Sequence, residues 1–331
     1  MYRYKNSPDD DPYRELWSRD QWLHPLENAD TMRFPLVITV EPTNACQNRC
    51  LYCSRQLMDR KIGYMDMEVM DRISHEAGKH RAAIRHGGFG EPLLHPRIVD
   101  IVANNKKHDV LTTIFSNCHQ MNEDMMRAFV DLGLDEIRFS SSGLTPEEHN
   151  AVRCNSDYED DFARKLEMAY NIREKMNAKA PFLTLYTNVL DYRSEAFTEH
   201  VEGYFEHFLQ FADKVDIDLT MFSRVKELEH VKKYVEQQSI REEHKRCVTL
   251  FLKVIAHWNG DIFACDCCYN HEDDFYLGTM GKDGFTIEQG YLSDKIQQLR
   301  QELSFAMGHD EFALCRDCYS NTTKWDETTT K

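Results

Sequence analysis

The chain has 331 residues, 41% of them hydrophobic, which is enough for two domains or for one barrel with an appendage. Its 56 acidic and 40 basic residues give a net charge of −16, which argues against a nucleic acid or an anionic membrane surface as a partner. No apolar run approaches the ~18 residues of a membrane span, and the N-terminal residues show no apolar signal-peptide region, so we expect a cytoplasmic protein.

Residues 1–33 are polar, acidic and aromatic, without clear periodicity, and we interpret them as an ordered arm that covers one end of a barrel. A part in the substrate mouth is the alternative. From residue 34 onward, short β-rich runs alternate with helical stretches. The runs lie at 36–40, 83–86, 111–116, 136–141, 182–188 and 215–221, and the helical stretches at 67–79, 96–107, 122–132, 162–177 and 195–211. This alternation predicts a parallel sheet with helical crossovers, either barrel-like or doubly wound.

The eleven cysteines favour metal binding over a disulfide framework, because their number is odd and the chain is expected in the cytoplasm. The first group follows the first β-rich run, in Cys46-Gln-Asn-Arg-Cys50-Leu-Tyr-Cys53. Three thiolates on one short loop suit an iron–sulfur cluster and leave one iron open for a small molecule. A structural zinc site would need a fourth ligand, which no nearby Cys or His supplies. Three unrelated core cysteines are the alternative interpretation.

A glycine-rich segment, His86-Gly-Gly-Phe-Gly-Glu-Pro92, follows the second β-rich run. Glycines let the backbone approach a ligand closely, and a carboxylate can accept a hydrogen bond from an ammonium group. By itself such a loop is weak evidence. One strand–helix unit after the cysteine loop, it is a strong signal.

The two motifs together resemble those of the radical S-adenosylmethionine (SAM) enzymes, with Tyr52 as the aromatic residue of the cysteine motif. The resemblance implies a partial (β/α)6 barrel with its site at the carboxyl ends of the strands. It also implies a [4Fe–4S] cluster on Cys46, Cys50 and Cys53 whose open iron binds SAM, and a reductant such as flavodoxin or ferredoxin. In that family, reductive cleavage of SAM yields a 5′-deoxyadenosyl radical. The implied SAM-binding residues are Tyr52, Gly88, Gly90, Glu91, Asn117, Ser140, Ser142 (in place of the commoner Asp) and Arg153.

Two further segments of the barrel region allow more than one interpretation. Asp216 and Asp218 alternate with apolar residues on the sixth run, so they point either into the barrel toward substrate or to solvent from an edge strand. Residues 223–246 are highly charged with i, i+4 pairs, which predicts a solvated helix that connects two domains.

The second cysteine group begins with two apolar runs around Asn259-Gly260, which predict a β-hairpin with a type I′ turn. The hairpin would bring Cys247 and Cys265 together, and Cys315-Arg-Asp-Cys318 could add two thiolates. Four cysteines suit zinc as well as iron–sulfur. Their spacing resembles the twitch or shortened SPASM domain of some radical SAM enzymes, which implies one auxiliary [4Fe–4S] cluster. The expected organisation is an arm (1–33), a partial barrel (34–222), a connection (223–246) and a small hairpin-plus-helix cluster domain (247–331).

Cys267, Cys268 and Asp266 remain as candidate catalytic residues. A cysteine could donate a hydrogen atom, as in radical SAM epimerases, or simply pack near the cluster. Asp266 could act as a general base or be a solvated loop residue. We expect oxidation of a secondary alcohol on a small sugar- or cyclitol-like substrate, because a separate peptide-recognition domain is missing. The alternatives are a redox-neutral epimerase, a peptide- or protein-modifying enzyme, and a zinc-bearing binding protein without redox chemistry.

Overall fold

A computed structural model of the chain describes residues 1–192, 194–220, 222–235, 247–303, 311–316 and 318. Parts of the predicted connection and cluster domain, residues 236–246, 304–310, 317 and 319–331, lie outside the described residues, as does residue 221. The strands are β1 (Tyr2–Tyr4), β2 (Val37–Val40), β3 (Ala83–His86), β4 (Thr112–Ser116), β5 (Glu136–Ser142), β6 (Phe182–Val189), β7 (Lys214–Leu219), β8 (Lys253–Ala256), β9 (Asp261–Phe263) and β10 (Tyr276–Thr279). The longer helices are α3 (Met67–His80), α4 (Ile98–Lys107), α5 (Glu123–Asp131), α6 (Pro146–Arg153), α7 (Arg164–Lys175), α8 (Glu195–Phe208) and α12 (Asp294–Leu303).

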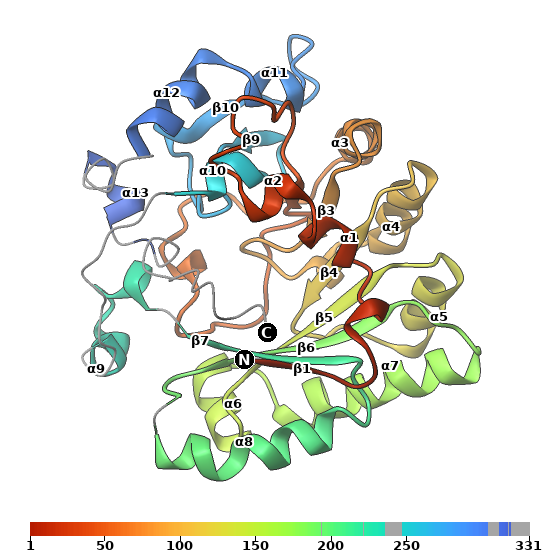
Figure 1. The fold of residues 1–331 in the computed structure, drawn as a ribbon. Coiled ribbons are helices and arrows are strands. Elements are labelled where there is room, and N and C mark those ends of the chain that lie inside the picture. The colour runs from red at the N-terminus through yellow and green to blue at the C-terminus, as the bar shows by residue number, and fades with distance from the viewer. Residues whose placement is uncertain (193, 221, 236–246, 304–310, 317, 319–331) are drawn as a thin grey trace.

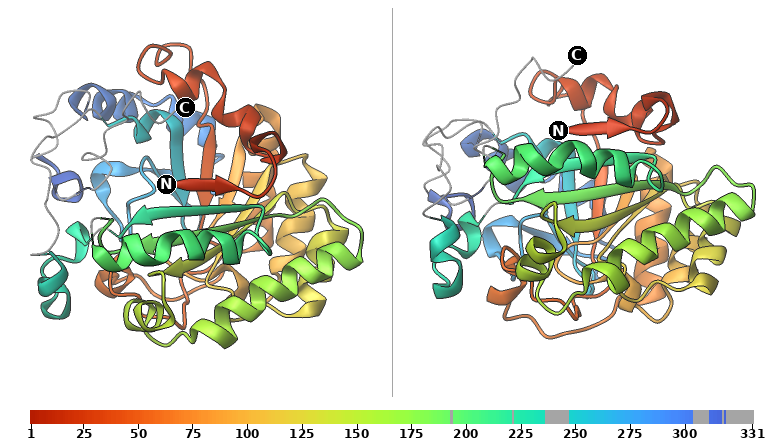
Figure 2. Two further views of the ribbon diagram at one scale, coloured as in Figure 1. Left: turned by 60° about the horizontal axis from the view of Figure 1, so that its bottom comes forward. Right: turned by 90° about the horizontal axis from the view of Figure 1, so that it is seen from below.

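Strands β2 to β7 lie side by side in chain order, and each pairs in parallel with the next. Helices α3, α4, α5, α7 and α8 lie on the outer side of the curved sheet (Figure 1; Figure 2 shows the same helices from below). This is the open, partial (β/α)6 barrel that the alternation and the family resemblance predicted. The carboxyl ends of the six strands therefore meet at one rim, where the cysteine and glycine loops begin.

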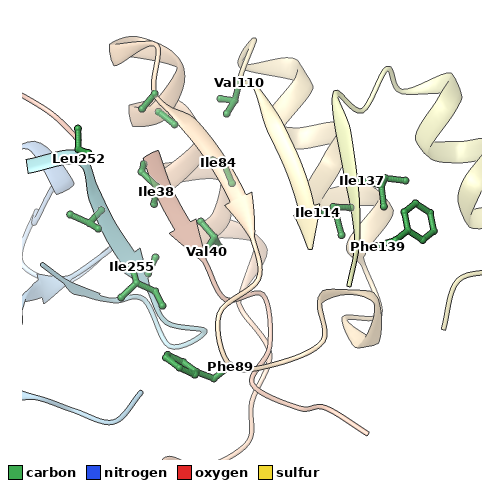
Figure 3. Close-up of a cluster of buried hydrophobic side chains, with 14 of the residues drawn as sticks. Ile38, Val40, Ile84, Phe89, Val110, Ile114, Ile137, Phe139, Leu252 and Ile255 are labelled. Carbon is green, nitrogen blue, oxygen red and sulfur yellow. The ribbon is translucent and has the colours of Figure 1, made fainter. Parts of the chain in front are cut away.

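The outer face of the sheet forms the main core. Its apolar residues on β2 to β5 pack against helix residues such as Met70, Ile73 and Ile101, and all of them are buried. Figure 3 shows this layer from Ile38 and Val40 on β2 across to Phe139 on β5. Because successive side chains of a strand alternate between faces, the residues between these apolar positions point to the inner face.

The N-terminal arm adds a strand to the sheet. Residues Tyr2–Tyr4 form β1, which pairs antiparallel with β7, so that Tyr2 lies opposite Asp216. Of the two interpretations of Asp216 and Asp218, the edge strand does not hold at Asp216, where β1 pairs with β7, whereas Asp218 lies beyond this pairing and is exposed. Farther along the arm, the short helices α1 (Arg14–Trp17) and α2 (Asp20–Leu23) follow, and Tyr13 and Leu16 pack on Val37 and Ala83 at the amino ends of β2 and β3.

The C-terminal hairpin continues the same sheet. β8 pairs in parallel with β2, and β9 and β10 follow antiparallel, which makes a sheet of ten strands. The predicted type I′ turn is wrong: Gly260 has φ 88°, whereas Asn259 does not have a positive φ. The Gly260 N–H donates to the His257 carbonyl (2.9 Å), as in a type I turn followed by a left-handed glycine. Short helices α10 (Thr249–Leu252), α11 (Ile287–Tyr291) and α13 (Ala313–Arg316) complete this part.

The described part of the connection is not a solvated helix. Residues 222–235 form short 3-10 turns and the four-residue helix α9 (Lys232–Val235). Phe222, Val225 and Val231 are fully buried and pack against Leu51, Tyr52 and Leu57 of the cysteine loop. The charged residues that led to the prediction of a solvated helix lie between these three buried residues in the sequence. Among the described residues, no helix combines the length and apolar character needed to cross a membrane.

Candidate active site

The first cysteine loop leaves the carboxyl end of β2 and carries Cys46, Cys50 and Cys53, all partly exposed. Burial raises the pKa of Cys46 to about 12 and that of Cys53 to about 11, so these thiols ionise at neutral pH only with a cationic partner. The three sulfurs do not all lie within 4.8 Å of one another. A single tetrahedral zinc with ~2.3 Å bonds would need sulfurs about 3.8 Å apart. At least one pair of these sulfurs is therefore farther apart than a single zinc holds them, and three cysteines on one loop have the donor set of a cluster with one open iron.

The glycine loop packs directly on the cysteine loop. The Glu91 N–H donates to the carbonyl of Ala45 (2.8 Å). A Cβ on Gly90 would lie only 1.9 Å from the carbonyl oxygen of Thr43, so any side chain there would push the two loops apart. Gly88 has φ 91°, a conformation that glycine adopts without strain. Gly90 is thus required by the neighbouring backbone, whereas the sequence suggested close approach to a ligand.

The Glu91 carboxylate ties the glycine loop to the end of β4. It accepts hydrogen bonds from the N–H of Leu93 (3.1 Å), the hydroxyl of Ser116 (2.7 Å) and the N–H of Asn117 (2.8 Å). Burial raises its pKa, although these three donors favour the charged form. Since an ionised carboxylate has about four acceptor positions, one remains for a further donor.

Asn117 connects β4 with the cysteine loop. Its side-chain NH2 lies 3.8 Å from the sulfur of Cys46, and its oxygen accepts from the Gln47 side chain (2.9 Å). The sequence suggested a place near the SAM ribose. The contact with Cys46 instead makes Asn117 a donor next to a candidate cluster ligand.

Arg153, Ser142 and Tyr52 come together on the other side of the cysteine loop. The Arg153 guanidinium donates to the Ser142 hydroxyl (3.2 Å) and the Ser141 carbonyl (3.2 Å), and it lies 6.0 Å from the centre of the Tyr52 ring. The carbonyl of Arg153 lies 3.9 Å from the Cys50 sulfur. Ser140 lies partly exposed on β5. The structure therefore brings together residues that are about a hundred positions apart (Cys50 and Arg153 differ by 103).

The second cysteine group surrounds one cavity. Cys247, Cys265, Cys315 and Cys318 line it together with Leu250 and Phe275, and Cys267 lines it as a fifth cysteine. The Cys267 N–H donates to the Cys265 sulfur (3.4 Å), and burial raises the pKa of Cys247 to about 11. A closed, apolar site with four or five thiols has the donor set of an iron–sulfur cluster and also of zinc.

Asp266 and Cys268 occupy different surroundings. Asp266 lies 3.8 Å from the ammonium of Lys253, and although burial acts to raise its pKa, the cations Lys253, Arg85 and Arg224 hold the pKa below its usual range. A lowered pKa makes a weaker general base. Cys268 is fully buried, is not among the residues lining the cavity, and its carbonyl lies 2.9 Å from the His257 ring.

Three residues that sequence reasoning missed connect the two groups. Arg60 forms a two-pronged ion pair with the buried Glu41 (2.7 and 2.8 Å) and donates to the Tyr269 carbonyl (2.7 Å). Arg224 donates to the Cys267 sulfur and lies 3.7 Å from the Cys318 sulfur. Glu41 directly follows the first β-rich run, but nothing in the sequence pairs it with Arg60, and Arg224 lay in a segment that was predicted to be a solvated helix.

Comparison with known proteins identifies the class. Residues 40–185 match the Radical SAM superfamily, so this part of the chain is a radical SAM domain. A [4Fe–4S] cluster and SAM are the cofactors of this superfamily, and the three cysteines of the first loop have the donor set of such a cluster.

Two curated relatives each match about two fifths of the chain. A tungsten-containing aldehyde ferredoxin oxidoreductase cofactor-modifying protein of Pyrococcus furiosus is 30% identical over 144 residues, 43% of this chain and 40% of that protein. A PqqA peptide cyclase of Ruegeria pomeroyi is 26% identical over 146 residues, 44% of this chain and 38% of that protein. The matches thus span about two fifths of each relative.

Solved structures resemble the fold over most of its length. BtrN in complex with AdoMet and 2-DOIA has a TM-score of 0.53 at 14% identity, covering 86% of this chain and 93% of BtrN. An anSMEcpe structure with bound AdoMet has a TM-score of 0.60 at 16% identity, covering 87% of this chain and 88% of that one. At these identities the likeness shows the fold alone.

Proposed function

We propose that this protein is a radical SAM oxidoreductase that oxidises a secondary alcohol of a small polar substrate, such as a sugar or a cyclitol. The observation that carries the proposal is the set of cysteines around one cavity. Asp266 follows Cys265 in the sequence and lies 3.8 Å from the ammonium of Lys253. A redox centre held there would lie next to a carboxylate that can take a proton. BtrN, whose structure with 2-DOIA resembles this chain over 93% of its length, supports the same assignment.

At the first site, the proposed roles follow from the contacts. Cys46, Cys50 and Cys53 hold the cluster, Asn117 and the surrounding backbone donate to its ligands, and Glu91 fixes the glycine loop that would carry the methionyl end of SAM. Tyr52, Ser140, Ser142 and Arg153 line the side that would take its ribose and carboxylate. When bound, this cofactor pair supplies the radical that removes a hydrogen atom from the substrate.

At the second site, Cys247, Cys265, Cys315 and Cys318 would hold an auxiliary [4Fe–4S] cluster, whose chemistry would be the acceptance of one electron. Oxidation of a secondary alcohol to a ketone removes one hydrogen atom, one proton and one electron, and a cluster held by these cysteines would supply the acceptor for the electron. Asp266, held between Lys253 and Arg85, is our candidate for the proton acceptor. Its lowered pKa makes it a weak base, so the assignment depends on its place beside Cys265 and Cys267 and not on its basicity.

Anaerobic reconstitution with iron and sulfide, followed by reductant and SAM, tests the proposal. If both sites hold a [4Fe–4S] cluster, the chain should contain roughly eight irons. If the second site holds zinc instead, the chain should contain roughly four irons. A panel of sugars and cyclitols should stimulate release of 5′-deoxyadenosine, with one ketone formed per SAM consumed. In deuterated water, deuterium at an inverted carbon without ketone would instead identify an epimerase that uses Cys267 or Cys268.

Modification of a peptide is the second candidate function. It is favoured by the PqqA peptide cyclase of Ruegeria pomeroyi, which matches 44% of this chain. A precursor peptide that stimulates SAM cleavage when sugars and cyclitols do not would decide for it.

A further inference from the structure

The inner face of the barrel carries an arginine, Arg85, that forms no ion pair among the described residues, although Asp266 acts on it electrostatically. On β3, Ile84 belongs to the helix-facing core, and the His86 ring lies 2.7 Å from the side-chain NH2 of Asn105 on α4. Arg85 stands between them and therefore points to the opposite, inner face. In the described part of the chain it forms no ion pair, and its Nε has no hydrogen-bond partner.

A second unsatisfied group lies beside it. Thr39 on β2 pairs in register with Arg85 and points to the same face, because its neighbours Ile38 and Val40 belong to the outer core. Thr39 is only 6% exposed, and its hydroxyl has no hydrogen-bond partner among the described residues. Buried polar groups are almost always paired in folded proteins. Two adjacent exceptions on one face indicate a missing ligand.

The surroundings hold the guanidinium in place for such a ligand. Arg85 stacks on the Phe115 ring at 4.5 Å, and Arg138 approaches the same ring at 5.1 Å. Arg138 differs in one respect, because its Nε donates to Glu136 (3.0 Å). Arg85 thus has the stacking contact of a positioned arginine, while its donors remain available.

This position lies close to the reaction centre. Arg85 is two residues before Gly87 on the same face, which at ~3.3 Å per residue is about 7 Å from the start of the glycine loop. A Cβ on Gly87 would lie 3.5 Å from Phe115, so the loop begins directly above the stacked pair. Lys253 and Asp266 lie on the other side of Arg85.

We propose that Arg85, with Thr39 beside it, binds an anionic group of the substrate, either a carboxylate or a phosphate. A guanidinium matches both groups with paired hydrogen bonds. Arg85 is half-buried with an unpaired Nε, and the carboxylate that acts on it, Asp266, also lies 3.8 Å from the Lys253 ammonium, so the guanidinium keeps donors for an anion that arrives from outside. The inference rests on the proposed function and narrows its substrate to polar molecules that carry a negative charge.

Retention of matched neutral and anionic compounds tests the proposal without turnover. The reconstituted full chain, anaerobic and saturated with SAM, is dialysed to equilibrium against glucose, gluconate and glucose 6-phosphate. A second arm uses acetylated, amidated Ala-Glu-Ala and Ala-Gln-Ala to distinguish a peptide carboxylate from that of a small metabolite. We expect at least one anionic compound to be retained tenfold or more over its neutral counterpart.

The variants assign that retention to Arg85. Arg85→Gln should abolish the preference, Arg85→Lys should keep part of it, and Thr39→Val should weaken it severalfold. Arg127→Gln, on the exposed surface of α5, should change nothing. Iron content and the SAM dissociation constant serve as folding controls, and if Arg85→Gln fails them, Arg85→Lys and Thr39→Val decide.

Equal retention of neutral and anionic members in both arms, or an unchanged preference in these variants, would overturn the proposal. The same samples, treated with reductant, report 5′-deoxyadenosine. Anion retention without its release would sink the proposed function and leave the anion site standing. If neutral and anionic sugars stimulate the release of 5′-deoxyadenosine equally, the proposed function stands and the anion site is overturned.

Discussion

The two cysteine groups bring several thiols together in different ways. The first holds its three thiols on one loop of eight residues at the barrel rim, partly exposed, with the loop fixed by backbone contacts to residues 90–91 and 152–154. The second collects its cysteines from three distant segments around a closed cavity. A rim loop leaves room for a substrate-like cofactor to enter, whereas a closed cavity suits a centre that only exchanges electrons. This difference between the two groups can be tested by removing one thiol from either of them.

Removing one thiol from the rim loop has the largest expected effect. Cys50→Ala should eliminate SAM cleavage, because two remaining thiolates cannot hold the cluster, and iron should fall from roughly eight to roughly four per chain. Iron analysis and 5′-deoxyadenosine release are the measurements. Cys154→Ser is the matched control, since Cys154 is also partly exposed and lies near this loop. Unchanged cleavage in Cys50→Ala would remove this loop from the reaction.

Removing one thiol from the closed cavity should separate cleavage from oxidation. Cys247→Ala should also lose about half of the iron, yet still cleave SAM, while ketone formation disappears because the electron acceptor is gone. Cys118→Ala is the control, because Cys118 is also fully buried but does not line the cavity. Full ketone formation in Cys247→Ala would show that the second group has no redox role.

Glu91→Gln tests how strongly SAM binding depends on the hydrogen bonds that the Glu91 carboxylate accepts. Ser116 donates to one carboxylate oxygen and Asn117 to the other, so an amide NH2 at either position loses at least one of these bonds, the glycine loop should shift and the SAM dissociation constant should rise about tenfold to a hundredfold. Equilibrium binding of SAM under anaerobic conditions measures this. Glu123→Gln, on an exposed helix position, should bind SAM as the wild type does.

Acidification should lower the stability of the folded chain through His86 on β3. Burial lowers the pKa of His86 to about 3, against 6.5 when exposed, so between these values the unfolded chain binds a proton that the folded chain does not. The contribution of His86 is therefore fully present above pH 6.5 and falls by about 1.4 kcal/mol per pH unit below it.

The comparison is thermal unfolding of the wild type and His86→Gln at pH 7.0 and about 5.5, at one scan rate. We expect the variant to lose less stability than the wild type on acidification. An equal loss in both proteins would show that His86 already titrates normally in the folded state.

The smallest effect concerns Arg224, which joins the two regions. Its guanidinium donates to Cys267 and approaches Cys318, and hydrogen bonds to sulfur stabilise the more negative, reduced form of a cluster. Arg224→Met should lower the midpoint potential of the second cluster by up to about 59 mV, a tenfold change for one electron. A redox titration followed by electron paramagnetic resonance measures this, with the potential of the rim cluster as internal control.

The sequence was most informative where a site is contiguous. The cysteine motif, the glycine loop and all six barrel strands could be predicted because each depends on a few neighbouring residues, and β3 has the predicted bounds. The Glu41–Arg60 pair, the place of Cys267 in the cavity and the Thr39–Arg85 pair could not, because each is created by the approach of distant segments. Val225 and Val231 were misjudged since charged neighbours outnumber them.

The pairing of β8 with β2 has a consequence for how the chain is made. Val37 of the first barrel strand meets Lys253, so while the barrel emerges from the ribosome one flank of β2 stays uncovered until most of the polypeptide has been synthesised. Open flanks of apolar strands recruit other chains. We therefore expect truncations before residue 253 to accumulate in inclusion bodies, and co-expressed chaperones to raise the yield of the full-length chain.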